Sequence, residues 1–136
     1  MNFKWEQTVA LVKARAHGRC EYCLMHQSLQ GATFHVEHIL PQSKGGSDVP
    51  ENLAWCCPSC NLRKSDRVEG ADPLTGGVVA LFNPRLNVWS DHFGWEGYEV
   101  VGKTPIGRST IAALQMNGGR RMAIRRAEQQ FGLFPN

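Results

Sequence analysis

Two C-x-x-C pairs constrain the fold of this chain more than any other feature. The first pair is Cys20 and Cys23, and the second is Cys57 and Cys60. The short spacing lets two thiolates meet one ion, and two such pairs complete the tetrahedron that zinc prefers in structural sites. A redox role is the alternative for either pair alone, but neither lies between a predicted strand and helix. We therefore predict structural zinc on these four cysteines.

Composition predicts a single domain, and the sequence contains no segment typical of membrane targeting. The chain has 136 residues, of which 42% are hydrophobic, as is normal for a domain with its own core. No apolar run is long enough for a signal-peptide core or a membrane span. We expect a cytoplasmic protein without membrane contact. Reduced thiols are normal there, so the fifth cysteine, Cys56, is predicted to be a small buried residue.

Local patterns predict the elements around the cysteines. Trp5, Val9, Val12 and Ala16 recur at helical spacing, which predicts a helix over residues 4–16. The stretch 33–40 is largely β-branched or aromatic and reads as a strand ending in a loop. A second short apolar run covers 52–57, and Pro58 is suited to the first turn of a short helix.

The second half of the chain is turn-rich and aromatic. Residues 70–77 mark the edge of the first unit, and short strands and loops are expected beyond it. Two short helices are predicted within 108–117 and 120–132. From residue 103 onward the only acid is Glu128, whereas the basic residues there are Lys103, Arg108, Arg120, Arg121, Arg125 and Arg126. The positive field of the chain is therefore expected near its carboxyl terminus.

The residues between the two cysteine pairs resemble the HNH endonuclease family. The matching residues are Glu37-His38, Ile39, Pro41, Ser43, Gly45-Gly46, Asn52-Leu53, Cys57, Cys60, Asn61 and Lys64. The resemblance implies an α+β fold: a ββα-metal core stapled by the four-cysteine zinc site. We expect an amino-terminal helix (1–18), the nuclease core (19–69) and a carboxy-terminal extension (70–136) packed on the core.

The family implies metal-dependent cleavage of DNA phosphodiesters, one strand at a time. His38 then serves as general base, since histidine can accept a proton near neutral pH. Glu37 and Asn61 would hold catalytic Mg²⁺ or Mn²⁺ through oxygen ligands. Asn52 would hold the backbone around His38. Asn61 stands where other members carry a histidine, but an amide oxygen is also a metal ligand.

Basic residues suggest where DNA is bound. Arg63, Lys64 and Arg67 follow the metal ligand on one predicted helix and could contact phosphates. A second set, Arg120, Arg121, Arg125 and Arg126, recurs at roughly one helical turn and could follow a phosphate backbone. An ordinary solvated face is the alternative for both sets. RNA is left open as a substrate, and the chain is expected to be a monomer or weak homodimer.

Two other function classes remain beside the enzyme. A non-catalytic, zinc-stabilised nucleic-acid-binding module would keep the fold without the chemistry. A zinc-stabilised protein-interaction domain is less favoured, because it gives no reason for Glu37, His38 and Asn61 to occur together. Conversion of supercoiled plasmid to open circles separates the enzyme from both.

Overall fold

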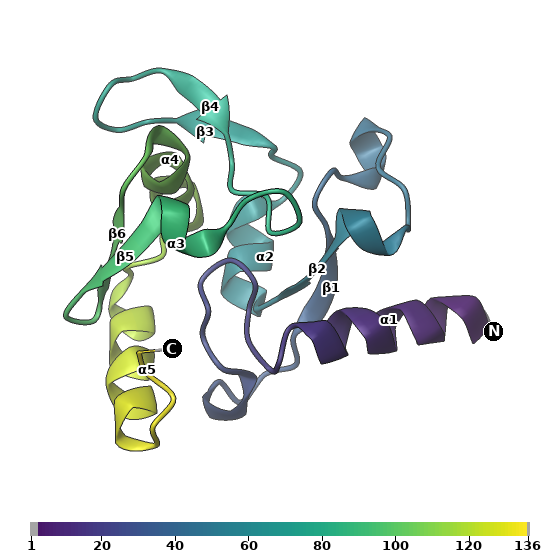
Figure 1. Ribbon diagram of the computed structural model, residues 1–136, viewed down its shortest axis with the longest axis horizontal. Helices are drawn as coiled ribbons and strands as arrows, with labels where there is room; N and C mark the ends of the chain where they lie inside the picture. Colours follow the sequence, from purple (N-terminus) through teal and green to yellow (C-terminus); the bar gives the residue numbers. More distant parts are fainter. Residues whose placement is uncertain (1–2, 136) are drawn as a thin grey trace.

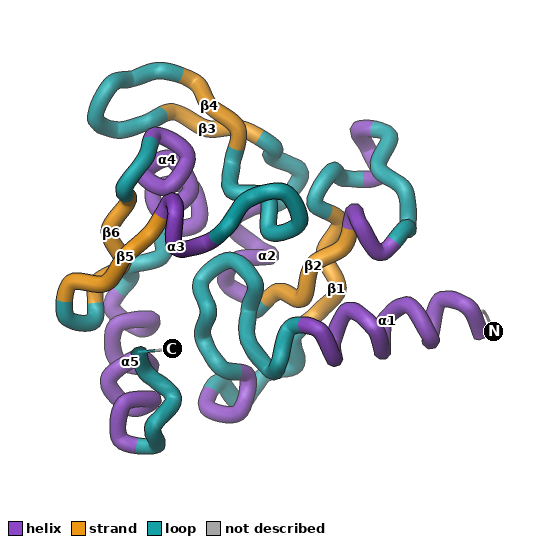
Figure 2. Tube along the Cα trace, in the orientation of Figure 1, coloured by secondary structure: helices purple, strands orange, loops and turns teal. Residues whose placement is uncertain are grey.

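The computed structural model describes residues 3–135 and combines helices with small antiparallel sheets (Figures 1 and 2). Within this range the five α-helices are α1 (Phe3–Arg15), α2 (Pro58–Lys64), α3 (Trp89–His92), α4 (Pro105–Leu114) and α5 (Gly119–Gln130). The strands are β1 (His35–His38), β2 (Leu53–Cys56), β3 (Glu69–Ala71), β4 (Val78–Ala80), β5 (Phe93–Glu96) and β6 (Glu99–Gly102), each paired with its neighbour in sequence. The α+β class predicted from the sequence is confirmed.

The β1–β2 hairpin and helix α2 form the ββα unit. β1 pairs antiparallel with β2, so that Glu37 lies opposite Ala54 and His38 opposite Leu53. All four residues of β2 are buried, and α2 packs against β1. The strand predicted over 33–40 is shorter because the chain turns at Pro41 into a 3-10 helix, η2 (Gln42–Lys44).

Helix α1 packs against this unit along one side, and its amino-terminal end extends beyond the hairpin (Figure 1). Val12 and Ala16 are buried in the same core as β2. The helix ends where His17 and Gly18 adopt left-handed backbone conformations, at φ 54° and 77°. Gly18 suits such a position because it has no Cβ. The predicted amino-terminal helix is thus present, within about one residue at each end.

The second half of the chain folds back onto the first. The turn-rich stretch 70–77 lies within the β3–β4 hairpin, where Arg108 from α4 forms an ion pair with the buried Asp72. This guanidinium holds the pKa of Asp72 well below its usual range. Helix α4 begins at Pro105, earlier than predicted, because Thr104 caps it by accepting from the Gly107 N–H.

One core joins the two halves. It contains Val12, Leu53 and Tyr22 from the first half together with Phe93 and Leu114 from the second. The expected short strands and helices after residue 77 are therefore not a separate body. None of the helices in the described range has the length and apolarity that crossing a bilayer requires.

The turn at Gly45 and Gly46 gives a test of the loop that follows β1. A Cβ at Gly46 would lie 1.7 Å from the Leu40 carbonyl oxygen, whereas a Cβ at Gly45 would meet nothing within 4 Å. We expect Gly46→Ala to destabilise the fold by about 3 kcal/mol or more, because backbone must move. Gly45→Ala, the matched control at φ 90°, should cost only about 1 kcal/mol from conformational strain. Urea unfolding of both variants measures this, and equal destabilisation would contradict the assigned contact.

Candidate metal centre and adjoining pocket

The four predicted cysteines converge into one cluster. Cys20 and Cys23 lie in the turn after α1, and Cys57 and Cys60 lie at the start of α2. All four are buried, and their sulfurs lie within 4.8 Å of one another. A zinc–sulfur bond of about 2.3 Å implies a sulfur–sulfur edge of about 3.8 Å in a tetrahedron, and the Cys23–Cys57 separation is 3.8 Å. The donor set and its spacing therefore fit zinc.

Local backbone structure in the folded chain positions these thiols. Cys57 is the N-cap of α2, and its sulfur accepts a hydrogen bond from the Cys60 N–H at 3.3 Å. In the other pair a tight turn is closed by the Cys20 N–H, which donates to the Met25 carbonyl at 3.0 Å. Cys56 is also buried but lies outside the four-thiol cluster; its thiol donates to the Cys57 carbonyl, as suits a small core residue.

Arg121 contacts the thiol cluster from the carboxy-terminal helix α5. Its Nη1 donates to the Cys60 sulfur at 3.1 Å, and its Nη2 donates to the Leu114 carbonyl at 2.7 Å. Burial disfavours the charged guanidinium, but the adjacent Cys60 and Cys23 more than offset this, and the pKa of Arg121 is raised. Four thiolates around Zn²⁺ would carry a net charge of about −2, and this buried cation would offset part of it.

The predicted basic stripe on α5 is therefore wrong for two of its four residues. Arg121 is only 4% exposed and Arg125 only 1%. Arg125 donates to the carbonyls of Met116 and Tyr98, and its guanidinium lies over the Trp95 ring. Neither side chain can reach a phosphate. Periodicity alone could not distinguish these buried arginines from the exposed Arg120 and Arg126.

Lys64 is also buried and differs from its predicted role in DNA contact. Its Nζ donates to the Glu37 Oε2 at 2.7 Å and to the Ile39 carbonyl at 3.0 Å. The other Glu37 oxygen accepts from the Tyr22 hydroxyl at 2.6 Å. Burial raises the pKa of Glu37, while Lys64 and Tyr22 oppose that shift by favouring the carboxylate. Lys64 thus fixes Glu37 and joins α2 to β1.

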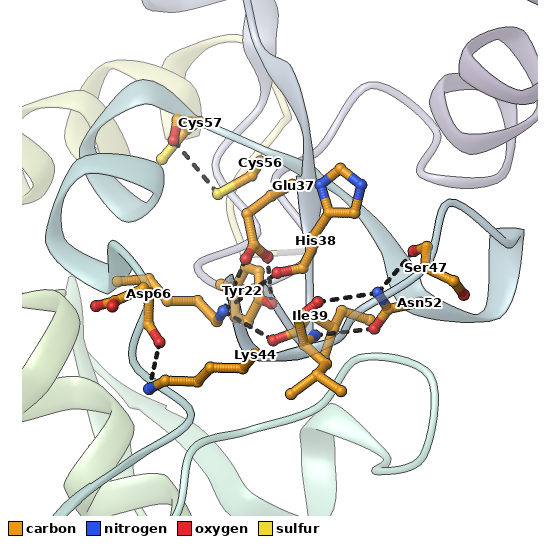
Figure 3. Close-up of polar contacts among 12 residues, drawn as sticks. Tyr22, Glu37, His38, Ile39, Lys44, Ser47, Asn52, Cys56, Cys57 and Asp66 are labelled. Atoms are coloured by element: carbon orange, nitrogen blue, oxygen red, sulfur yellow. Dashed lines mark hydrogen bonds and ion pairs between the residues drawn. The ribbon is translucent and has the colours of Figure 1, made fainter. Parts of the chain in front are cut away.

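His38 has a different set of partners from its neighbour Glu37, because the two side chains leave β1 in different directions (Figure 3). Its Nε2 lies 2.7 Å from the Asp48 Oδ1, which also accepts from the Gln42 amide at 3.2 Å. The Trp5 ring is parallel to the imidazole within 5°, with centroids 6.4 Å apart. His38 is 21% exposed and Asp48 is 59% exposed, so the imidazole is partly buried and its partner lies at the surface.

Asn52 supports the loop that follows His38. Its Oδ1 accepts from the Leu40 N–H at 2.8 Å, and its Nδ2 donates to the carbonyls of Leu40 and Ser47 at 3.0 and 2.9 Å. Figure 3 shows the amide between these two segments of backbone. Asn52 therefore holds the backbone that follows His38, because its three hydrogen bonds fix both sides of the turn.

Three of the residues predicted to be catalytic line one shallow pocket of about 200 Å³. Glu37, His38 and Asn61 all line it, together with Pro41 and Gln42 among others. Asn61 directly follows Cys60 on α2, so the thiol cluster sets its position. A carboxylate and an amide oxygen beside one pocket are ligands suited to Mg²⁺ or Mn²⁺. Each oxygen of the Glu37 carboxylate has more than one lone-pair site, so its bonds to Lys64 and Tyr22 leave acceptor capacity.

Sequence reasoning missed three residues of this region: Tyr22, Asp48 and Trp5. Tyr22 lies inside the first C-x-x-C pair, where the spacing of the cysteines is the only signal. Asp48 is in the glycine-rich loop, where a carboxylate is usually solvated. Trp5 fits the apolar stripe of a helix. Only the folded chain brings Asp48 and Trp5 to His38.

Comparison with known proteins agrees with this geometry. Residues 20–67 match the model of the HNH endonuclease family. The chain is similar to the Septu protein PtuB of Bacillus thuringiensis, with 26% identity over 104 residues, which is 75% of this chain. The chain spans 38% of the length of that relative. No solved structure matches.

We predict that the purified protein holds one zinc ion per chain. Cys57→Ser should lose the zinc and the cooperative unfolding transition, because closed thiolate sites contribute directly to folding. The matched control is Cys56→Ser, which changes an adjacent buried thiol outside the cluster and should keep the zinc. Elemental analysis and thermal unfolding measure both effects. Folded parent protein without zinc would refute the assignment.

Proposed function

Because residues 20–67 match the model of the HNH endonuclease family, we propose that this chain hydrolyses DNA phosphodiester bonds with a divalent cation, cutting one strand at a time. The family match supports nuclease activity in general. The observation that carries the specific proposal is the shared pocket of Glu37, His38 and Asn61, built on a loop that Asn52 fixes. A single such site accounts for nicking by a monomer, and a weak homodimer would be needed to cut both strands together.

His38 is the general base in this proposal. An ionised Asp48 can only accept hydrogen bonds, so the His38 Nε2 bears the hydrogen and Nδ1 carries the lone pair of the neutral ring. That lone pair takes a proton from water, and the water oxygen attacks phosphorus as the bond to the 3′ oxygen breaks. Asp48 therefore orients the imidazole and stabilises its protonated form, as a carboxylate partner does for other histidine bases.

Glu37 and Asn61 would hold the catalytic Mg²⁺ or Mn²⁺. A cation there supplies positive charge that offsets negative charge on the phosphate and leaving oxygen. Lys64 positions Glu37 through their buried ion pair. Asn52 acts only by fixing the loop between Leu40 and Ser47.

Exposed arginines supply affinity for the substrate. Arg63 and Arg67 lie exposed at and beyond the end of α2, and Arg120 and Arg126 lie exposed on α5. Arg63 and Arg120 line one surface pocket, so α2 and α5 present positive charge side by side. These four residues, called the exposed arginines below, replace the larger basic set inferred from sequence. DNA is the proposed substrate, and competition with RNA of equal length tests it.

One observation favours the alternative, a zinc-stabilised nucleic-acid-binding module without catalysis. Both Glu37 oxygens already accept strong hydrogen bonds, from Lys64 and Tyr22. A protein that binds DNA yet leaves supercoiled plasmid intact at every concentration of Mg²⁺ and Mn²⁺ would establish this module and refute the enzyme.

The central test of the base is His38→Ala. We expect nicking of supercoiled plasmid to fall by about 10²–10⁴-fold, since that is the usual contribution of a general base, while zinc content and DNA affinity persist. His35→Ala is the matched control, because His35 is exposed on the same strand and lines no part of the pocket. Nicking by His38→Ala at the parent rate would show that the base is wrongly assigned.

A second prediction concerns the exposed arginines. Changing all four to glutamine should weaken binding to DNA of any sequence and flatten its salt dependence, by about 0.9 in log–log slope for each phosphate that the variant no longer neutralises. A variant with Lys13 and Lys103 changed to glutamine lowers the net charge elsewhere and should keep the parent slope. Affinities at several salt concentrations measure both. Parallel lines for the parent and the fourfold variant would mean that these arginines are only solvated.

A further inference from the structure

A second pocket lies beside His38, between helix α1 and the loop that contains Asp48. Its volume is about 330 Å³. The residues that line it come from the start of α1 and from the loop before β2: Lys4, Trp5, Thr8, Asp48, Val49 and Pro50. Helix α1 ends at Arg15, so this wall precedes the matched residues 20–67. The α1 wall of the pocket therefore lies outside the match to the family, whereas Asp48, Val49 and Pro50 lie within it.

Two residues connect this pocket to the proposed base. Trp5 is parallel to the His38 imidazole, with 5° between the ring planes. Asp48 lines the pocket and also holds the His38 Nε2 at 2.7 Å. A group bound in the pocket would consequently lie beside the His38 imidazole.

The lining combines an aromatic face with polar edges. The half-buried Trp5 lines the pocket with its indole, and Val49, which is 48% exposed, adds apolar area. Asp48 is an acceptor at the edge, and the exposed Lys4 brings a positive charge to the rim. The Thr8 hydroxyl donates to the Lys4 carbonyl and keeps its own acceptor capacity. A flat heterocycle attached to an anion matches each of these features.

We propose that this pocket binds one unstacked nucleobase next to the cut phosphodiester. The base stacks on Trp5, its exocyclic amino group donates to Asp48, and Lys4 contacts the adjoining phosphate. The inference rests on the proposed nuclease function, because it places the base relative to His38. A base can stack on a protein ring only after leaving its own stack, so the substrate is a strand with an unpaired or easily displaced nucleotide, rather than regular duplex.

The test compares two labelled oligomers of about 12 residues, matched in length and phosphate charge. One is oligo(dC), whose bases carry an exocyclic amino group that can donate a hydrogen bond to a carboxylate. The other is an abasic deoxyribose-phosphate chain. Binding is measured in buffer free of divalent cations, so that no cutting occurs. The ratio of the two affinities reports the contribution of the bases and cancels that of the phosphates.

We expect the parent to prefer oligo(dC). Trp5→Leu, which keeps an apolar side chain but removes the π face, should reduce that preference by about five- to a hundred-fold, the usual effect of losing one stacked base. Trp5→Phe should retain most of it. Leu11→Ala, at an exposed position of the same helix outside the pocket, is the matched control and should behave as the parent.

Three results would overturn the proposal. The first is a parent that binds both oligomers equally, which decides the matter without any variant. The second is an unchanged preference in Trp5→Leu. The third is an equal loss of affinity for both oligomers, which would mean that Trp5 acts through the fold. If Trp5→Leu does not fold, Thr8→Leu fills the pocket from the next helical turn and should abolish the preference; a parent-like ratio in that variant refutes the site.

Nicking of plasmid by the parent is measured separately with Mg²⁺ present. Nicking without a preference for oligo(dC) leaves the proposed function intact and removes only the base pocket. A preference without nicking removes the catalytic proposal and leaves a base-binding module.

Discussion

The four-thiol cluster is the constraint on which the rest of the structure depends. The ββα unit consists of two four-residue strands and a seven-residue helix, too little buried surface to hold a rigid site by itself. The cluster ties the turn after α1 to the start of α2, next to Asn61. Arg121 then joins the same cluster to α5 through Cys60. One metal ion would thus fix the amino-terminal turn, the central helix and the carboxy-terminal helix together.

A buried ion pair provides the second fixed point. Lys64 is 2% exposed and Glu37 is 5% exposed, and their contact links the last turn of α2 to β1. Removing one partner of such a pair leaves an uncompensated buried charge and typically costs about 3–5 kcal/mol. The two ends of α2 are therefore held differently, by thiols at its start and by an ion pair at its end. Asn61 lies between them, which explains how so short a helix can hold this side chain in place.

Local rules in the sequence predicted most of the elements, and the paired cysteines predicted the metal centre. The Cys57-Pro58 start of α2 and the end of α1 near Gly18 follow from capping and turn chemistry. The predictions that failed concern charged residues: Lys64, Arg121 and Arg125 were expected at the surface and lie inside. Their burial depends on partners distant in the sequence, such as Glu37 and Cys60. Asp48 and Trp5 were missed for the same reason, because only tertiary packing brings them to His38.

The most direct test of two metals with separate roles is a plasmid-nicking assay on zinc-loaded and zinc-stripped protein, each with and without added Mg²⁺ or Mn²⁺. The thermal unfolding of each sample is recorded beside its nicking rate. Open circles should form only from zinc-loaded protein with the second cation added. Zinc-loaded protein without that cation should be folded and inactive, and zinc-stripped protein should be unfolded under both conditions. A zinc-stripped protein that stays folded and nicks plasmid at the parent rate would contradict the account.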